Sequence, residues 1–547
     1  MSQFLFQEAH YWTISISARG FFSRVFVYRQ RFSNSIKLIN MPSKIYSAAV
    51  IGLDAQVIEV ETDVSYGLRC FNIVGLGDRA VEESIERVGA AIKSTDLKPA
   101  HSKPWRVLVN LAPADLKKEG SLYDLPIALG FLLETKQIKF DPRGKIIIGE
   151  LALDGKLRPV KGALAIAGLT KERGFSEIIL PKANAPEAAL IENLKVIGLE
   201  SLKEIIEYLE GKKEILPLKI EVEDFLERVE YPIDLAWIKG QEYAKRAIEI
   251  AAAGAHNILL QGPPGAGKTL LAKAIPSILP KLSFEESLEV TKIYSIAGLL
   301  PNDKPLISQR PFRSPHHTAS EVALIGGGNP PKPGEITLSH RGVLFLDEFP
   351  EFHRDVLESL RQPLEEGKIT ISRARHSLTW PARFTLVAAT NPCPCGNLNN
   401  PEKKCTCTPS QIAMYRRKLS GPLMDRVDLF IEVPSLKYEK LVAKDSENLS
   451  EKIREKVEAA RKIQKERFSG LKISTNSEMP LKKIEKFCQI DLKSQDLLRK
   501  YVNSGKLSAR GYHRVLKVAR TIADLEGAEK ISFDNLAEAL MYRIKED

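Results

Sequence analysis

The fold of this chain is decided by nine residues, Gln261-Gly262-Pro263-Pro264-Gly265-Ala266-Gly267-Lys268-Thr269. They follow the apolar run 257–260, which predicts a buried strand, and precede residues 270–274, which predict the start of a helix. The glycines allow backbone N–H groups to close around phosphate oxygens, because a Cβ would block that approach. Strand, glycine-rich turn and helix predict a P-loop. Every fixed position of the motif matches, which favours a P-loop over a flexible glycine loop that matches by chance.

In the P-loop, Lys268 would reach the β- and γ-phosphates and the Thr269 hydroxyl would ligate Mg²⁺. Two further strands are expected to complete the nucleotide site. The apolar run 343–346 ends in Asp347 and Glu348, at the end of a strand where open α/β sheets place ligands. Asp347 would hold Mg²⁺, mainly through water, and Glu348 would deprotonate the attacking water. The run 386–390 ends in Asn391, whose amide would fix that water, although an asparagine there is often only a turn former.

Composition and charge set wider bounds. The 547 residues suffice for roughly three or four domains. With 44% hydrophobic and 27% charged residues, the chain can bury a sizeable core. No window approaches about 18 uninterrupted apolar residues, so we expect no membrane span. The net charge of +11 is concentrated in residues 1–40 and 436–547. The C-terminal charges are interleaved, which favours a solvated helical surface over a polyanion-binding one.

Residues 1–40 form an extension of unusual composition, with five basic residues and Glu8 as the only acid. Such a segment is typical of an organellar transit peptide. The alternative is that translation begins at Met41, where well-patterned sequence starts. We favour the second interpretation, expect the extension to be poorly ordered, and expect a cytoplasmic protein, since six cysteines without a secretory signal do not predict disulfides.

An α/β domain is predicted over residues 41–210. Strands are expected at 45–51, 55–61, 68–73, 106–110, 145–152 and 178–180, and helices at 81–93, 124–133 and 202–209. This region resembles the Lon-protease-like domain at the head of the YifB/ComM family of magnesium-chelatase-like AAA+ ATPases. The resemblance is carried by the segments Phe71–Leu76, Val109–Leu116, Lys118–Ser121, Asp124–Leu129 and Gly149–Gly155.

The resemblance raises the question of a protease, because Lon proteases use a serine with a lysine base. Ser121 lies near the position of that serine, but the lysine position holds Leu164. A serine without an adjacent base is a weak nucleophile. We therefore expect a non-catalytic DNA-binding or assembly platform, with Lys161 keeping a peptidase open as an alternative.

A linker with a short helix at 222–229 is expected at 211–235. The rest of the chain resembles the same family, which implies a P-loop AAA+ core with an αβα fold at 236–435 and an all-α lid at 436–547. Lid helices are expected at 439–468, 491–503, 513–525 and 533–544, and a helix at 243–253 precedes the P-loop strand. The resemblance implies that Arg426 is an arginine finger directed at a neighbouring subunit, with Asp425 holding it. It also implies that Arg510 contacts the γ-phosphate from the lid. Arg514 shares that helix face and remains an alternative.

Two insertions interrupt the core. Residues 367–384 alternate polar and apolar side chains and carry Lys368, Arg373, Arg375 and Arg383 without an acid, which predicts a basic β-hairpin. Resembling proteins place this hairpin in a central pore, where a ring of six would suit a phosphate backbone; the alternative is that the side chains only face solvent. The other insertion, 310–329, contains His316 and His317. Adjacent residues seldom chelate one ion, so we expect structural or pore-loop roles.

A cysteine cluster follows Asn391 directly. Its four thiols, separated in pairs by nine residues, are Cys393, Cys395, Cys405 and Cys407. Four thiolates can close a tetrahedral Zn²⁺ site, although the C-x-C spacing is tighter than the commoner C-x-x-C. We favour structural zinc over four reduced thiols, with the metal bracing the loop beside Asn391.

The resemblance covers about residues 44–547 and implies an ATP-driven homo-hexameric ring that uses Mg²⁺. ComM-like members act as DNA helicases that drive branch migration, which predicts ATP-dependent translocation on DNA here. The alternative is a magnesium-chelatase-like motor subunit that remodels a protein partner. The fused Lon-like domain and the cysteine loop disfavour that alternative, and the presence of Lys268, Asp347, Glu348 and Asn391 disfavours an inactive scaffold.

Overall fold

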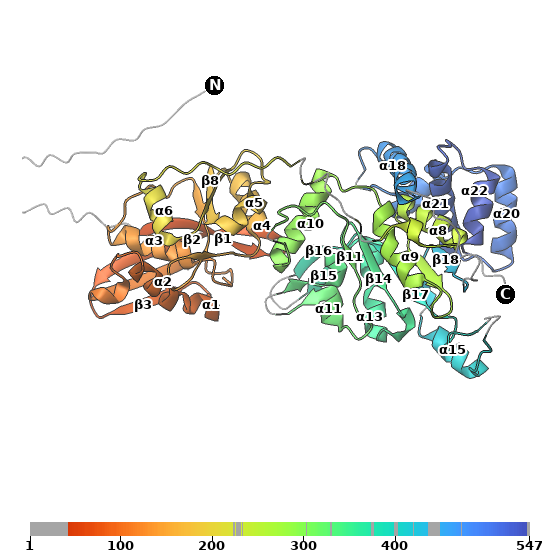
Figure 1. Ribbon diagram of the computed structural model, residues 1–547, viewed down its shortest axis with the longest axis horizontal. Coiled ribbons are helices and arrows are strands. Elements are labelled where there is room, and N and C mark those ends of the chain that lie inside the picture. The colour runs from red at the N-terminus through yellow and green to blue at the C-terminus, as the bar shows by residue number, and fades with distance from the viewer. Residues whose placement is uncertain are drawn as a thin grey trace, which may run out of the picture. The chain divides into compact units, whose positions relative to one another are not determined.

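The structure is a computed structural model whose described residues all belong to one unit, Pro42–Asp547 (Figure 1). It describes residues 42–222, 225, 231, 233–301, 303–328, 331–372, 377–398, 403–419, 421–435, 449–471 and 473–543. The expected N-terminal extension, most of the expected linker helix and the start of the expected helix 439–468 lie outside these ranges. Among the described residues, no helix combines the length and apolar character needed to cross a membrane.

The N-terminal domain begins with a mixed sheet of order β1-β2-β4-β3. Its strands are β1 (Ser43–Ile51), β2 (Asp54–Tyr66), β3 (Cys70–Val74) and β4 (Trp105–Ala112). β4 alternates buried with less buried residues, because one face of the sheet packs on the core. The helices α2 (Ser84–Lys93) and α3 (Asp124–Glu134) contribute to that core. The predicted strands at 45–51, 55–61 and 106–110 and the helix at 124–133 are confirmed.

A second sheet of the N-terminal domain is parallel, with order β5-β8-β9. Its strands are β5 (Lys145–Ile147), β8 (Glu177–Pro181) and β9 (Lys195–Leu199). The helices of this part of the chain are α4 (Ala163–Glu172), α5 (Ala185–Ala188) and α6 (Leu202–Leu209). The predicted single strand at 145–152 is wrong. Gly149 exchanges backbone hydrogen bonds with Leu122 and Leu125. The chain therefore leaves the sheet and forms a separate hairpin of β6 (Glu150–Leu151) and β7 (Leu157–Arg158).

The predicted helix 81–93 is also interrupted, at Glu83, between α1 (Arg79–Glu82) and α2. The Arg87 guanidinium donates to the Ala80 carbonyl at 2.8 Å. A continuous helix would use that carbonyl for the Ser84 N–H, so this side chain competes with the helical hydrogen bond. The same guanidinium forms an ion pair with the buried carboxylate of Asp124.

The central domain, which carries the predicted P-loop, is built on a parallel sheet of order β11-β14-β17-β10-β18. Its strands are β10 (Ile258–Gln261), β11 (Phe312–Arg313), β14 (Val343–Leu346), β17 (Thr385–Thr390) and β18 (Leu429–Glu432). Successive side chains of β10 pack into two different hydrophobic cores: Ile258 and Leu260 pack into one, and Leu259 packs into the other. The sheet is therefore buried on both faces, as an αβα core requires.

Helices flank this sheet, and two short hairpins are inserted. The helices are α8 (Glu242–Gly254), α9 (Lys268–Ala274), α10 (Phe284–Ala297), α11 (Glu321–Ile325), α12 (Glu335–Leu338), α13 (Arg354–Ser359), α14 (Arg361–Glu366), α15 (Pro409–Arg417) and α16 (Gly421–Met424). One hairpin pairs β12 (Gly326–Gly327) with β13 (Lys332–Pro333), and the other pairs β15 (Lys368–Ser372) with β16 (Ser377–Pro381). The predicted hairpin between the acid-bearing strand and Asn391 is confirmed.

The C-terminal region is helical over its described residues (Figure 1). It contains α18 (Leu449–Arg467), α19 (Leu481–Phe487), α20 (Leu492–Asn503), α21 (Ala509–Leu525) and α22 (Phe533–Met541). α21 begins before the predicted residue 513, because the Ser508 hydroxyl caps it by accepting the Gly511 N–H. These helices share a core with α8, and His256 bonds to Thr521 at 2.7 Å.

Candidate nucleotide site and cysteine cluster

The P-loop connects β10 to α9 at the carboxyl end of the central sheet. Gly262 is required by a close backbone approach, because a Cβ there would lie 2.1 Å from the Val433 carbonyl oxygen. Gly267 has φ +88°, a conformation that glycine adopts readily, and α9 starts at the next residue. Gln241 braces the loop from outside by donating to the carbonyls of Ala266 and Pro434, at 3.3 and 2.7 Å.

Lys268 lies inside the loop that carries it. Its ammonium donates to the carbonyls of Gly262 (2.7 Å) and Pro263 (2.9 Å) and to Asn391 Oδ1 (3.1 Å). Burial lowers the pKa of the Lys268 amine, and the nearby Asp347 carboxylate opposes that shift. The structure thus brings the P-loop lysine to the polar end of β17, the strand that lies between β10 and β14.

The two residues predicted to hold Mg²⁺ also meet. Thr269 Oγ1 donates to Asp347 Oδ2 at 2.7 Å, so a hydroxyl and a carboxylate converge from α9 and the end of β14. These oxygen donors fit Mg²⁺, which takes few protein ligands and retains waters. Glu348 is the next residue and has φ +49°, which is uncommon outside glycine. Its N–H donates to Asp347 Oδ1 at 2.9 Å.

His317 is a neighbour of the site that was not predicted. Its Nδ1 lies 3.1 Å from Glu348 Oε2, and its ring packs edge-on against Phe352. The signal that could have found it is topological. β11 and β14 are parallel neighbours, so the loop after β11 leaves the sheet beside the acids after β14.

The two predicted arginines lie together, away from the P-loop contacts. Arg426 pairs with Glu365 and donates to the Pro422 carbonyl at 2.7 Å. Arg510 lies 3.8 Å from Asp425, and its side chain is 63% exposed. Among the described residues, neither arginine contacts the P-loop of its own chain. The structure therefore places Arg510 beside the segment that carries Arg426.

Arg514, the alternative to Arg510, has a structural partner. It forms an ion pair with the buried carboxylate of Asp428, whose Oδ2 also lies 3.5 Å from His256 Nδ1. Burial alone would raise the pKa of Asp428, but Arg514 and His256 hold it well below its usual range. The exposed guanidinium of Arg510 is therefore the better candidate for contact with a nucleotide.

The four clustered cysteines converge on one point. The Sγ atoms of Cys393, Cys395 and Cys405 lie 3.4 to 3.7 Å apart, and all four sulfurs lie within 4.8 Å of one another. A tetrahedral site with Zn–S bonds of ~2.3 Å would separate its sulfurs by about 3.8 Å. A disulfide would need about 2.05 Å. The Asn397 backbone N–H helps to lower the pKa of Cys395 to about 5, whereas the neighbouring sulfurs of Cys393 and Cys395 raise the pKa of Cys405 and Cys407. The cluster fits a four-coordinate metal.

The basic hairpin is described only in part. Lys368 pairs in register with Pro381, is half exposed, and lies 3.7 Å from Glu366. Arg383 is directed to Glu478, at 3.8 Å. Arg373 and Arg375, which were predicted to contact DNA, lie outside the described residues.

The serine of the N-terminal domain has a carboxylate as its partner. Ser121 Oγ donates to Glu150, which in turn lies 3.4 Å from Arg158. Leu164 is buried, and Lys161 packs beside Gly298 of the ATPase core. Lys118 is fully buried, and its amine donates to the Pro113 carbonyl. None of these lysines contacts Ser121, so the described residues hold no serine–lysine pair.

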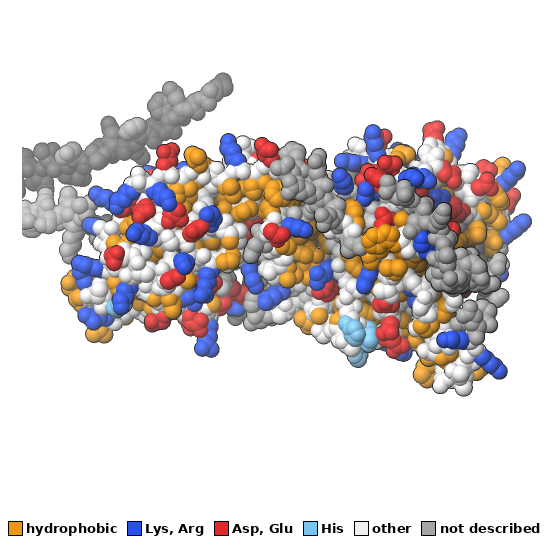
Figure 2. Space-filling model, viewed as in Figure 1, with side chains coloured by type: hydrophobic (Ala, Val, Ile, Leu, Met, Phe, Trp, Pro, Cys, Tyr) orange, Lys and Arg blue, Asp and Glu red, His pale blue; other side chains and the backbone are white. Residues whose placement is uncertain are grey.

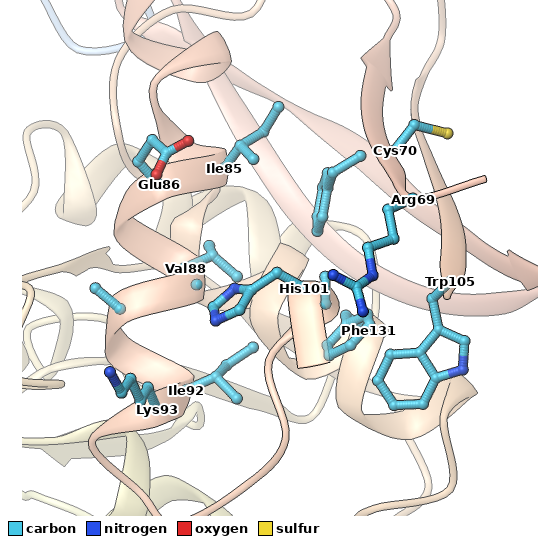
Figure 3. Close-up of a pocket in the computed structure, with 14 residues that line it drawn as sticks. Arg69, Cys70, Ile85, Glu86, Val88, Ile92, Lys93, His101, Trp105 and Phe131 are labelled. Atoms are coloured by element: carbon cyan, nitrogen blue, oxygen red, sulfur yellow. The ribbon is translucent and has the colours of Figure 1, made fainter. Parts of the chain in front are cut away.

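The same domain has a cavity of about 430 Å³ between α2, β3 and β4 (Figure 3). Figure 3 shows the side chain of Arg69 next to Phe131 and Trp105, and the ring of His101 directed toward α2, near Val88. It shares no residue with the nucleotide site, and its walls are largely aromatic and aliphatic.

A parallel sheet with a P-loop lysine, an acid pair and an asparagine at the ends of neighbouring strands defines a P-loop ATPase. Comparison with known proteins gives the family. Residues 234–441 match the family described as magnesium chelatase, subunit ChlI, and residues 447–543 match its C-terminal family. Residues 60–184 match the family described as subunit ChlI of Mg-chelatase. The protein is therefore a magnesium-chelatase-family AAA+ ATPase.

Full-length relatives narrow this assignment. The chain is 44% identical to competence protein ComM of Haemophilus influenzae, over 91% of this chain and 97% of ComM. It is 41% identical to YifB of Escherichia coli, over 92% of this chain and 97% of YifB. Lon protease 2 of Bacillus subtilis is 28% identical over 31% of this chain and 32% of its own length. The chain belongs to the YifB/ComM family of magnesium-chelatase-like proteins and has Lon-like similarity.

Proposed function

We propose that this protein is an ATP-driven ring motor that translocates on DNA and drives helicase or branch-migration activity. The observation that carries the proposal is an assembled nucleotide site in a chain that aligns with a competence protein over 97% of that protein's length. The match makes DNA the first substrate to test.

The residues of the site have distinct roles in hydrolysis. Lys268 and the P-loop N–H groups bind the phosphates, and Thr269 with Asp347 would hold Mg²⁺, which neutralises developing phosphate charge. Glu348 accepts the proton of the attacking water, and Asn391 orients that water. Because His317 contacts one oxygen of Glu348, the carboxylate has to leave that contact, or share it, when it acts as a base.

The arginines support a ring. Arg426 and Arg510 lie near each other but have no contact with the P-loop of their own chain among the described residues. An arginine finger that is supplied by a neighbour completes a site at each subunit interface. We propose a homo-hexamer in which both arginines reach the nucleotide of the adjacent subunit.

The hairpin of β15 and β16 is the proposed DNA contact, through Lys368, Arg373 and Arg375. The face in Figure 2 mixes basic and acidic side chains over the N-terminal domain and shows no uniform basic surface there. A local basic element can contact a phosphate backbone, and this hairpin carries three basic residues, Lys368, Arg373 and Arg375, without an acid.

We also infer that Zn²⁺ is the metal of the four-cysteine cluster. A site with four sulfur donors selects zinc or iron–sulfur chemistry, and a closed tetrahedral set is typical of structural zinc. Metal analysis of the purified protein is expected to give one zinc per chain. Loss of that zinc in Cys405→Ser, but not in Cys70→Ser, would support the assignment.

The motor proposal is tested by the ATPase rate with and without branched DNA, with Glu348→Gln as the blank. We expect DNA to raise the rate, and the triple change of Lys368, Arg373 and Arg375 to alanine to remove the increase. A matched control changes the exposed Lys171, Arg173 and Lys203 of the N-terminal domain to alanine. Equal loss in both triple variants would contradict the hairpin assignment.

The second candidate is a chelatase-like motor that remodels a protein, favoured by the chelatase families that match residues 234–441 and 447–543. Glu348-dependent hydrolysis that is indifferent to every DNA tested would overturn the DNA motor and favour this alternative.

A further inference from the structure

The cysteine cluster touches the P-loop. Gly396 lies between the second and third cysteines, is buried, and has φ +78°. A Cβ at this position would lie 2.5 Å from Pro264 Cδ and 2.8 Å from Pro264 Cγ. The cluster and the phosphate-binding loop are therefore in close contact, at a point where the chain leaves room for no side chain.

The position of Gly396 is set by the cluster itself. Its N–H donates to the Cys393 carbonyl at 2.9 Å, which closes a turn that contains Cys393 and Cys395. The Cys395 N–H donates to Cys407 Sγ at 3.3 Å, which ties that turn to the second cysteine pair. A metal that gathers all four sulfurs would fix this turn against Pro264, whereas four uncrosslinked thiols would leave its position to weak contacts.

The cluster is also joined to the other side of the nucleotide site. Cys393 comes two residues after Asn391, which accepts from the Lys268 ammonium at 3.1 Å. Directly after Cys407, α15 begins and brings Tyr415 to within 3.4 Å of Thr390. The cysteine loop therefore begins at the carboxyl end of β17, and the helix that follows it contacts the same end through Tyr415.

The contact on Pro264 has a direct path to the catalytic lysine. Pro263 and Gly262 supply the carbonyls that hold the Lys268 ammonium, and the Gly262 N–H donates to the Thr390 carbonyl at 3.1 Å. A displacement of Pro264 would therefore move the same backbone that binds phosphate and positions Lys268.

We propose that the metal-bound cysteine cluster is a brace for the P-loop, so that metal occupancy sets the affinity of the site for nucleotide through the Gly396–Pro264 contact. By thermodynamic reciprocity, bound nucleotide then also tightens the hold on the metal. This inference rests on the proposed zinc site and does not depend on DNA binding or on ring translocation.

The test uses the full-length protein and two readouts, zinc per chain and the dissociation constant of a fluorescent ADP analogue. Removal of zinc with a zinc-selective chelator that leaves Mg²⁺ in solution is expected to weaken ADP binding about tenfold or more. Restoring one equivalent of zinc should restore the affinity.

A variant that keeps the metal isolates the contact. Gly396→Ala is expected to retain one zinc per chain and to weaken ADP binding about tenfold, since overpacking against Pro264 displaces the loop. The matched control is Gly470→Ala, because Gly470 has φ +79° with no atom near its absent Cβ. The control should bind ADP as the wild-type protein does.

The outcomes separate the two claims. A purified protein without stoichiometric zinc overturns the metal site and the brace with it. Zinc that is present, with ADP affinity unchanged both after its removal and in Gly396→Ala, overturns the brace alone. Circular dichroism of each variant identifies loss of fold, and an unfolded Gly396→Ala leaves the decision to zinc removal and return in the wild-type protein.

Discussion

The two α/β regions of this chain differ in what they have kept of their families' chemistry. In the ATPase core, Lys268, Asn391, Thr269 and Asp347 converge through bonds of 2.7 to 3.1 Å. In the N-terminal domain, the serine at the Lon-like position bonds to Glu150, and Leu164 is buried. Both regions retain a fold that can support catalysis, but only the core retains a full set of partner residues. The fold is therefore a poor guide to activity, which has to be judged from the residues of the site.

The contacts of Ser121 explain why we do not expect it to act as a nucleophile. A serine needs a neighbouring group that takes its proton, and the lysine or histidine that usually does so has no counterpart in contact here. The partner of Ser121 is instead the carboxylate of Glu150, which lies 3.4 Å from Arg158. Glu348, by contrast, is proposed to act on water next to phosphate and metal, where a carboxylate is sufficient.

The largest effect on ATP turnover is expected from Glu348→Gln in the ATPase core. Loss of a general base should lower the turnover number for ATP by about 10²–10⁴-fold, while nucleotide binding persists. Phosphate release and fluorescent-nucleotide titration measure the two quantities. Glu351→Gln, in the turn just after, is the matched control, and an equal loss there would show that Glu348 has no special role.

The next largest effect is expected from Arg426→Ala, at about a thousandfold in turnover. A finger that acts on a neighbour predicts complementation between defective subunits. Mixing Arg426→Ala with Lys268→Ala should recover part of the ATPase activity, because some interfaces then combine an intact site with an intact finger. No recovery in verified mixed assemblies would mean that Arg426 acts within its own subunit.

A change in the N-terminal domain should act on stability and not on chemistry. Leu164→Lys restores the Lon-like residue type but buries a charge, which we expect to cost about 3 kcal/mol of unfolding free energy without creating peptidase activity. Thermal unfolding and a fluorogenic peptide assay test both parts. Leu164→Met, which keeps volume and apolar character, should cost under about 1.5 kcal/mol.

The smallest effect concerns pH. His340 and Arg341 lower the pKa of Glu289 from 4.5 to about 2, so this carboxylate stabilises the core at pH above 4.5 and loses its effect as pH falls through 2. In the N-terminal domain, burial instead raises the pKa of Asp124 despite Arg87. Glu289→Gln should lower stability by at most about 1 kcal/mol near pH 7, since Glu289 is half exposed.

Melting curves of the wild-type protein and Glu289→Gln measure this effect as pH falls. The gap between them should begin to close below pH 4.5, on the approach to the folded pKa of about 2. A gap that stays constant from pH 7 to 3 would show that Glu289 is not a stabilising ion pair.

Local patterns predicted the parts of the molecule that depend on local sequence. The P-loop, the acids after β14 and Asn391 after β17 were found because apolar runs that end in polar residues mark strand ends. The absence of the Lon-like lysine at Leu164 was an expectation from the family resemblance and stays a prediction. The predicted strand at 145–152 was wrong, because Gly149 forms backbone hydrogen bonds with Leu122, before α3, and with Leu125, in its first turn. No local pattern contains that information.

Contacts between distant segments explain the other differences. His317 reaches Glu348 only through the parallel pairing of β11 and β14. Gly396 and Pro264 are separated in sequence, so their contact could not be predicted from either motif. Arg87, seven residues beyond Ala80, takes the carbonyl that a continuous helix would use. Contacts of this kind are decided by tertiary structure and not by local sequence.

We expect the chemistry of this chain to lie in the P-loop site and the Lon-like domain to be inert. This expectation is tested most directly by measuring ATP hydrolysis and peptide hydrolysis in one preparation of the wild-type protein, Glu348→Gln and Ser121→Ala. We expect ATP hydrolysis that Glu348→Gln abolishes and Ser121→Ala leaves unchanged, with no peptide hydrolysis that depends on Ser121. Peptide cleavage that disappears in Ser121→Ala, or ATP hydrolysis that survives Glu348→Gln, would contradict it.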